Sequence, residues 1–260
     1  TSSIIIIVSM TETNKPTAIE GLTIDIGLLA AHGVSLVTLA LIIKEAAAFS
    51  NATEALAFYG VYHREPGNQL IHFFGVPGIL WSGIIFLVHL NVPFLSNNKT
   101  IQSLLPGSQQ LTYGLILALV YLVFYLNIDP FGGSLYAPII YAMYSSACYL
   151  HQQDQGKSGS KSWVGTGKLL KYAFFLHVFS WYIQIHWGHK IIEGAQPAVL
   201  DSIGGALTVA PLFAYYEFLW LIGLNQDLQM QTLQAVQQKT LEICAAGNSA
   251  MRVCETLTSS

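Results

Sequence analysis

The chain has 260 residues, of which 53% are hydrophobic and 10% are charged, and its formal net charge is −3. Soluble domains carry about 25% charged residues, so this depletion predicts an integral membrane protein. The net charge is small and no basic stripe is present, so a nucleic-acid partner is not expected.

The N-terminal part of the chain offers one candidate membrane span. Residues 1–22 are polar and mixed after a short isoleucine run, and no secondary structure is predicted for them. Residues 26–43 are an apolar run of spanning length. They form either a first span or a helix that lies against the others or in the interface. We therefore expect residues 1–50 to be an N-terminal extension with a possible extra span.

The remaining chain alternates apolar runs with polar connections. Residues 44–68 are a polar connection in which a short helix is expected between residues 45 and 59. Asn68 is then placed to cap the next helix, because a short polar side chain accepts from the first free backbone N–H groups. Asp201 is expected to cap the last helix in the same way. The predicted spans are residues 69–90, 111–128, 134–150, 172–192 and 203–224.

These patterns predict an all-α fold, a polytopic transmembrane helical bundle of about five or six spans. Residues 51–224 would be a membrane-embedded catalytic domain, with membrane lipid around it. Residues 225–260 are expected to be a polar, partly helical tail, because leucines and a valine recur there in a weakly amphipathic pattern.

Two histidine clusters lie far apart in the sequence. The first is YHREPGNQLIH, from Tyr62 to His72, and the second is YIQIHWGHKIIE, from Tyr182 to Glu193. On an α-helix, His186 and His189 would share a face, and so would His189 and Glu193. Counting the spans as hairpins places both clusters near the same membrane face. We therefore expect the fold to bring them together as a metal site near that face.

Imidazole is the commonest metal ligand, and ionisable groups inside a membrane domain are costly enough to indicate function. Iron and zinc are the first candidates for four imidazoles and a carboxylate. The alternative is that some of these histidines are interfacial and bonded to backbone. Glu217, in the last span, is either a partner of a ligand histidine or a protonated acid between helices. The predicted metal ligands are His63, His72, His186 and His189.

The two clusters resemble the 2-hydroxy fatty acid dioxygenase family. The pattern is YHxxPxNxxIHxxxVP, followed later by GHxxxExxxPAxxD and APxFxxxE, and the resemblance covers about residues 55–224. It implies an Fe(2+) enzyme of the endoplasmic reticulum membrane that uses O2 to shorten a 2-hydroxy fatty acid by one carbon in phytosphingosine breakdown. The family histidines map onto His63, His72 and His189. Asn68 and Glu193 occupy motif positions, and with Glu217 they are the candidate catalytic residues.

Three other protein classes are alternatives to this family. A membrane di-iron desaturase needs HxxxH and HxxHH boxes, whereas this chain has eight histidines with one HxxH and no HH pair. A haem-binding electron carrier would use paired axial histidines. A non-catalytic transporter or scaffold would fit the predicted spans that Pro77 and Pro211 interrupt. Bound metal together with turnover would separate these classes from a dioxygenase.

Overall fold

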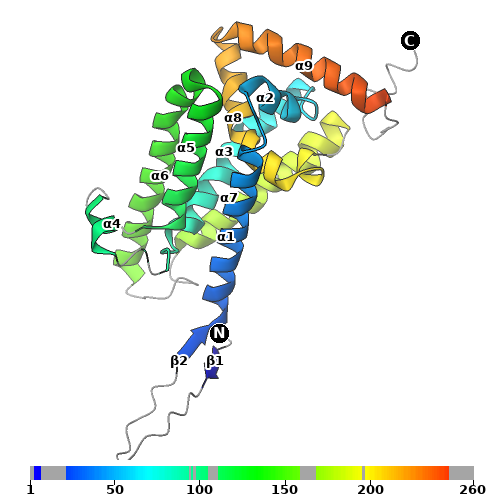
Figure 1. The fold of residues 1–260 in the computed structure, drawn as a ribbon. Helices are drawn as coiled ribbons and strands as arrows, with labels where there is room; N and C mark the ends of the chain where they lie inside the picture. Colours follow the sequence, from blue (N-terminus) through cyan, green and yellow to red (C-terminus); the bar gives the residue numbers. More distant parts are fainter. Residues whose placement is uncertain are drawn as a thin grey trace, which may run out of the picture.

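Helices make up almost all of the part of the chain that the computed structural model describes (Figure 1). The described residues are 3–6, 22–93, 95, 98–104, 111–158, 168–194 and 197–245. The elements are β1 Ser3–Ile6, β2 Leu22–Asp25, α1 Ile26–Ala46, α2 Ala52–Gly60, α3 Pro66–Val88, α4 Lys99–Leu104, α5 Tyr113–Ile128, α6 Pro130–Ser158, α7 Lys168–Tyr182, the π-helix η1 Ile183–Glu193, the 3₁₀ turn η2 Ala198–Leu200, α8 Ile203–Leu221 and α9 Gln226–Ala245.

The N-terminal strand pair was not predicted from the sequence. β1 pairs antiparallel with β2, with Ser3 opposite Asp25 and Ile6 opposite Leu22. Isoleucine is β-branched and favours extended backbone, which explains why this run forms a strand. The hairpin lies at the end of the molecule opposite α9 (Figure 1). It leaves the all-α prediction intact for the helical bundle that holds the site.

The bundle is built around α3. This helix packs against α5, α6, α7, α8 and η1. Val76, Leu80 and Ile84 recur every four residues along it and are at most 5% exposed, so they form one buried face. Pro77 lies within α3 without ending it, although its ring removes one backbone hydrogen bond. Because α3 contacts these five elements, it sets their positions relative to one another, and so determines which of their side chains can meet.

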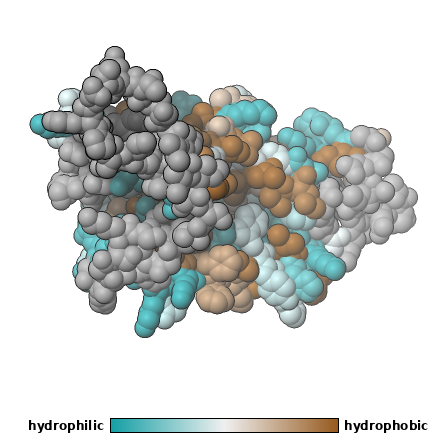
Figure 2. Space-filling model, turned by 90° about the horizontal axis from the view of Figure 1, so that it is seen from below, coloured by the Kyte–Doolittle hydropathy of each residue, from teal (hydrophilic) through white to brown (hydrophobic). Residues whose placement is uncertain are grey.

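Two helices of the described chain, α1 and α3, are long and apolar enough to cross a membrane, and α5 is a shorter apolar helix. Only 17% of the most apolar window of α1 is buried, so most of this helix faces outward. Its exposed side chains include Leu29, Val34 and Val37. Apolar side chains also reach the surface in the end-on view of Figure 2. The larger number of spans remains a prediction.

Both predicted helix caps were wrong. Pro66 occupies the first position of α3, which its fixed φ favours, so the helix starts upstream of Asn68. The N-cap of α8 is Ser202, whose hydroxyl accepts from the Gly205 N–H at 2.9 Å. Asp201 instead accepts a hydrogen bond from the Tyr62 hydroxyl. Each of the two polar side chains instead makes a contact away from the helix end.

The segment predicted as one span at residues 172–192 is two kinds of helix. α7 ends at Tyr182, and the π-helix η1 continues to Glu193. Its turn is wider than an α-turn because each N–H bonds to the carbonyl five residues earlier. Gly194, with φ 66°, ends it and donates its N–H to the His189 carbonyl. Side chains in η1 therefore point in other directions than an α-helix would give them.

The polar tail contains a helix, as expected. α9 crosses the end of the bundle and packs on α2 (Figure 1). α2 is the short helix expected between residues 45 and 59, and Asn51 caps it by accepting from the Glu54 N–H at 2.9 Å. The contact is close at Gly60, where an added Cβ would lie 2.8 Å from Val236. The chain just after α2 leads directly to His63.

Candidate metal centre

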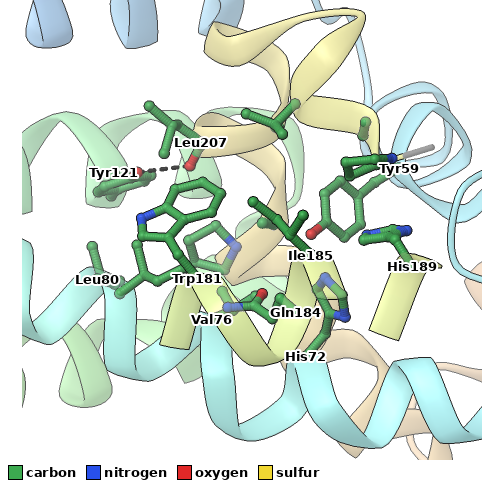
Figure 3. Close-up of a pocket in the computed structure, with 17 residues that line it drawn as sticks. Tyr59, His72, Val76, Leu80, Tyr121, Trp181, Gln184, Ile185, His189 and Leu207 are labelled. Carbon is green, nitrogen blue, oxygen red and sulfur yellow. Dashed lines mark hydrogen bonds between the residues drawn. The ribbon is translucent and has the colours of Figure 1, made fainter. Parts of the chain in front are cut away.

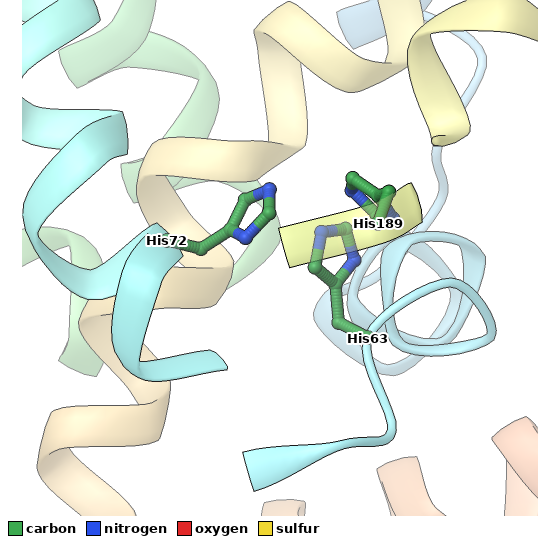
Figure 4. Close-up of side chains that lie close together, drawn as sticks. All are labelled: His63, His72 and His189. Atoms are coloured by element: carbon green, nitrogen blue, oxygen red, sulfur yellow. The ribbon is translucent and has the colours of Figure 1, made fainter. Parts of the chain in front are cut away.

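Three buried histidines from three separate segments meet at one point (Figure 4). His63 lies in the loop between α2 and α3, His72 lies on α3, and His189 lies in η1. One ring nitrogen of each lies within 4.8 Å of those of the other two, and the side chains are 2–3% exposed. The structure thus confirms that the two sequence clusters converge.

Backbone carbonyls orient two of the three rings. The Nδ1 atom of His63 is 2.9 Å from the Tyr59 carbonyl oxygen, and the Nδ1 atom of His72 is 2.9 Å from the Asn68 carbonyl oxygen. A carbonyl only accepts, so each Nδ1 carries the proton and each Nε2 keeps a lone pair. This arrangement, in which one nitrogen is bonded and the other is free, is typical of metal-ligating histidine.

Two ring nitrogens at this point are buried without a hydrogen-bond partner, Nε2 of His63 and Nδ1 of His189. Buried polar atoms without partners are rare and need an explanation, such as an ion. Burial, reinforced by the neighbouring His72 and His189 rings, lowers the pKa of His63 well below its ordinary value. The neutral imidazole that results is the form that binds metal.

The residues fit a transition metal. Three neutral imidazoles suit zinc, copper, iron or nickel, whereas calcium and magnesium require oxygen ligands. Among the described residues, no carboxylate joins the group that the three histidines form. Three protein ligands leave coordination positions for a substrate, as in catalytic rather than structural sites. The donor set does not distinguish between these transition metals.

Glu193 ties the end of η1 to the chain that carries the other two histidines. Its carboxylate accepts from the backbone N–H groups of Arg64 and Glu65, each at 3.1 Å. It also accepts from the Asn68 side-chain amide at 3.0 Å. Asn68 is fully buried, and its backbone carbonyl binds His72. The two residues therefore connect His189 to His63 and His72 through a single network.

Gly188 allows η1 to approach this network closely. A Cβ at this position would lie 2.3 Å from the Asn68 side-chain oxygen and 3.3 Å from Cε1 of His72. The first distance is too short for any side chain. A side chain before His189 would therefore displace the Asn68 side chain, which is fully buried and bonded to Glu193.

His186 is not brought into the group. Its ring stacks on Tyr182, with the ring centroids 5.2 Å apart and the planes at 10°. The physical reason is the π-helix, in whose wider turn residues three apart no longer share a face. His189 and Glu193 are four apart, and both are buried.

Glu217 lies near the centre but makes none of the contacts predicted for it. Its carboxylate oxygens are buried without a hydrogen-bond partner. It lines a polar cavity between α2, α8 and α9 that also contains His63 and Arg64. The described hydrogen bonds give it no ligand histidine as a partner, because Nδ1 of His63 and of His72 bind carbonyls instead.

An apolar cavity opens beside His72 and His189 (Figure 3). Most of its lining is apolar, and α3, η1 and α8 contribute most of the lining residues. The hydroxyl of Tyr59 points into it, while the ring of Tyr59 stacks on His63 at 3.9 Å. We call this space the near cavity. The residues that line it are Tyr59, His72, Val76, Ile79, Leu80, Tyr121, Trp181, Gln184, Ile185, His189, Pro197, Ala198, Val199, Ala206, Leu207, Ala210 and Pro211.

Tyr59 and the near cavity were missed from the sequence. The signal for Tyr59 was available, because it precedes His63 by four residues, as Asn68 precedes His72. On a helix that spacing places a histidine ring over a backbone carbonyl. The cavity had no such signal, since its lining comes from segments far apart in the chain.

Comparison with known proteins agrees with this centre. The family described as 2-hydroxy-palmitic acid dioxygenase, Mpo1-like, matches residues 49–221. The Saccharomyces cerevisiae protein named 2-hydroxy-palmitic acid dioxygenase MPO1 is 28% identical over 189 residues, which are 72% of this chain and 88% of the yeast protein. No solved structure matches the chain. The matched region contains all three histidines, and the chain belongs to the Mpo1-like 2-hydroxy-palmitic acid dioxygenase family.

Proposed function

We propose that this protein is an iron(II)-dependent dioxygenase that shortens 2-hydroxy fatty acids by one carbon. The reaction would take place in the endoplasmic reticulum membrane, as the α-oxidation step of phytosphingosine breakdown. The observation that carries the proposal is the buried group of His63, His72 and His189 beside an apolar cavity. Family membership supports the reaction class, and the name of the yeast relative supports a 2-hydroxy acid as substrate.

His63, His72 and His189 would hold the metal. Bound iron(II) would supply open positions for the carboxylate and hydroxyl of the substrate and would activate O2, while oxidation of the substrate would supply the electrons that reduce O2. The carbonyls of Tyr59 and Asn68 hold two of the rings in the tautomer that presents Nε2. The burial of all three rings keeps bulk water away from the reacting atoms.

The near cavity would take the acyl chain. Its apolar walls would hold the chain against Val76, Leu80 and Ile185, with the acid group toward His72 and His189. Burial raises the pKa of Tyr59, so its phenol stays protonated. Its hydroxyl points into the cavity, where it would donate a hydrogen bond to the carboxylate or hydroxyl of the bound acid.

We propose a positioning role for Glu193 and Asn68 in place of direct catalysis. The Glu193 carboxylate already accepts from two backbone N–H groups and an amide, so most of its lone-pair sites are occupied. It would act through His189, by fixing the end of η1 against the chain between α2 and α3. Glu217 lines a different cavity, together with His63, and does not line the near cavity, so any effect on the reaction would be indirect.

The surface supports a membrane location. α1 and α3 are long and apolar enough to span a bilayer, and large apolar side chains on α1, α3, α5 and α7 are exposed. Soluble monomers rarely expose extensive apolar patches. The family match over residues 49–221 supports a catalytic domain at 51–224, with residues 1–50 as an extension and 225–260 as a tail.

The test is metal content and product, measured on the same samples. Protein purified anaerobically in detergent is assayed for metals and then given iron(II), O2 and 2-hydroxypalmitate. We expect the acid one carbon shorter. Substitution of His63, His72 or His189 by alanine should remove the metal and lower turnover at least about 100-fold, beyond the effect of losing a residue that only supports a ligand.

His186→Ala is the matched control, because it removes a histidine from the same segment that lies outside the group. It should retain both the metal and the product. Full turnover by metal-free protein that is shown to be folded would contradict the proposal. Bound metal without turnover would instead indicate another substrate or electron transfer.

A further inference from the structure

A second apolar cavity lies beyond the near cavity, between α1, α3, α5 and α7. It is partly open to the surface, because Val34 in its lining is 68% exposed, and we call it the far cavity. The two cavities share part of their lining, so these side chains lie between them. The shared residues are Ile79, Leu80, Tyr121, Trp181 and Leu207.

The wall between the cavities is held by hydrogen bonds. The Tyr121 hydroxyl donates to the Leu207 carbonyl at 2.7 Å. The Trp181 indole N–H donates to Nε2 of His177 at 3.1 Å, and Nδ1 of His177 lies 2.8 Å from the Ser82 hydroxyl. Because Nε2 accepts, Nδ1 carries the proton and donates to Ser82. Trp181 is therefore fixed in place through two further residues.

The wall stands at the end of the near cavity that is remote from the metal centre. In Figure 3, Trp181, Tyr121 and Leu80 lie at one end and His72 and His189 at the other. Along α3 the cavity extends from His72 to Leu80, which is about 12 Å at the helical rise. An extended chain of single bonds advances roughly 1.2 Å per bond, so this length holds roughly ten carbons. A longer acyl chain must reach Trp181.

We propose that the far cavity is a second acyl subsite, and that Trp181 and Tyr121 form the gate that decides how long a chain the enzyme accepts. The inference rests on the proposed function. The occupant would be the methyl end of the same substrate and not a bilayer lipid, because the far cavity continues the near cavity directly. Two polar side chains in the lining already have hydrogen-bond partners. The Ser35 hydroxyl donates to the Ala31 carbonyl, and His177 is bonded to Ser82 and Trp181. Neither side chain therefore requires a polar ligand.

Gly83 offers a direct way to fill the far cavity. It lines that cavity from α3, and an added Cβ would meet nothing within 4 Å, so Gly83→Leu projects a side chain into open space. Gly33 on α1 is a matched control. A Cβ there also meets nothing within 4 Å, but Gly33 is exposed and does not line the cavity.

The experiment compares 2-hydroxydecanoate with 2-hydroxystearate. Both kcat/KM with the iron-loaded protein and the dissociation constant with metal-free protein in nanodiscs are measured. We expect Gly83→Leu to lower the ratio of long-chain to short-chain values at least about tenfold, since each excluded methylene is worth roughly fourfold in affinity. Gly33→Leu should leave the ratio unchanged.

Trp181→Ala gives an independent result in the opposite direction. Removing the indole opens the wall, so the preference should move toward longer chains, and His177→Phe, which removes the anchor of the indole, should move it the same way to a smaller extent. An unchanged ratio in Gly83→Leu protein, with wild-type metal content, would overturn the second subsite and indicate lipid in the far cavity. Absence of any turnover in iron-loaded wild-type protein would overturn the proposed function itself.

Discussion

At the residue scale, the metal centre depends on side chains that do not touch the metal position. Asn68 contributes its backbone carbonyl to His72 and its amide to Glu193. Glu193 in turn holds the N–H groups of Arg64 and Glu65. Residues that orient ligands in this way typically change metal affinity 10- to 100-fold when they are replaced.

We expect Asn68→Ala and Glu193→Gln each to destabilise the protein by about 1.5–3 kcal/mol, because each leaves buried partners of a charged hydrogen bond unsatisfied. The double variant should cost less than the sum of the two, since both remove the same interaction. The measurement is unfolding in detergent together with iron affinity.

Glu54→Gln is the control for this cycle. Glu54 also accepts two hydrogen bonds, from the backbone and hydroxyl of Ser50, but in an exposed setting. Its replacement should change the unfolding free energy by about 0.5 kcal/mol or less. If the changes in unfolding free energy for Asn68→Ala and Glu193→Gln are strictly additive, the contact between the two side chains does not stabilise the protein.

At the element scale, α9 covers α2, the helix that leads to His63. The packing is tight at Gly60, where an added Cβ would lie 2.8 Å from Val236 of α9 and 3.3 Å from Phe213 of α8. Helices approach this closely where a side chain is absent. The position of α2, and with it the loop that carries His63, is therefore set in part by the polar tail.

Gly60→Ala should destabilise the protein by about 1–3 kcal/mol through overpacking. Adding Val236→Ala removes the methyl group that the new Cβ meets, so the double variant should recover part of the loss. Thermal unfolding in detergent measures both. If Gly60→Ala is as stable as the wild type, α9 does not pack on α2 in solution.

At the scale of the whole molecule, the distribution of apolar residues predicts how the protein behaves in membranes. α1 exposes much of its apolar surface, and α3 places 44% of its most apolar window inside the bundle. We expect the protein to stay in the membrane pellet after an alkaline carbonate wash and to dissolve only in detergent. A peripheral protein bound through the polar tail would be released by carbonate, and that result would contradict membrane insertion.

The sequence predicted some features of the fold and the site well and others poorly, depending on which interactions determine each feature. The convergence of His63 and His72 with His189 was predictable, because apolar runs and turns determine which helix ends share a side. The exclusion of His186 was not, since nothing in its neighbours indicates π-helical winding. The predictions of the capping residues were wrong because Pro66 and Ser202, rather than Asn68 and Asp201, define where α3 and α8 begin. The cavities depend on packing between distant segments.

The π-helix limits which changes in this stretch of the sequence the metal centre can tolerate. A π-helix is related to an α-helix by an inserted residue, so its geometry depends on length more than on residue type. Loss of one residue between Ile183 and Gly188 would let the segment rewind as an α-helix and turn His189 away from His63 and His72. Substitutions at exposed positions of this stretch, such as Trp187 and Ile191, can accumulate, whereas insertions and deletions would be eliminated.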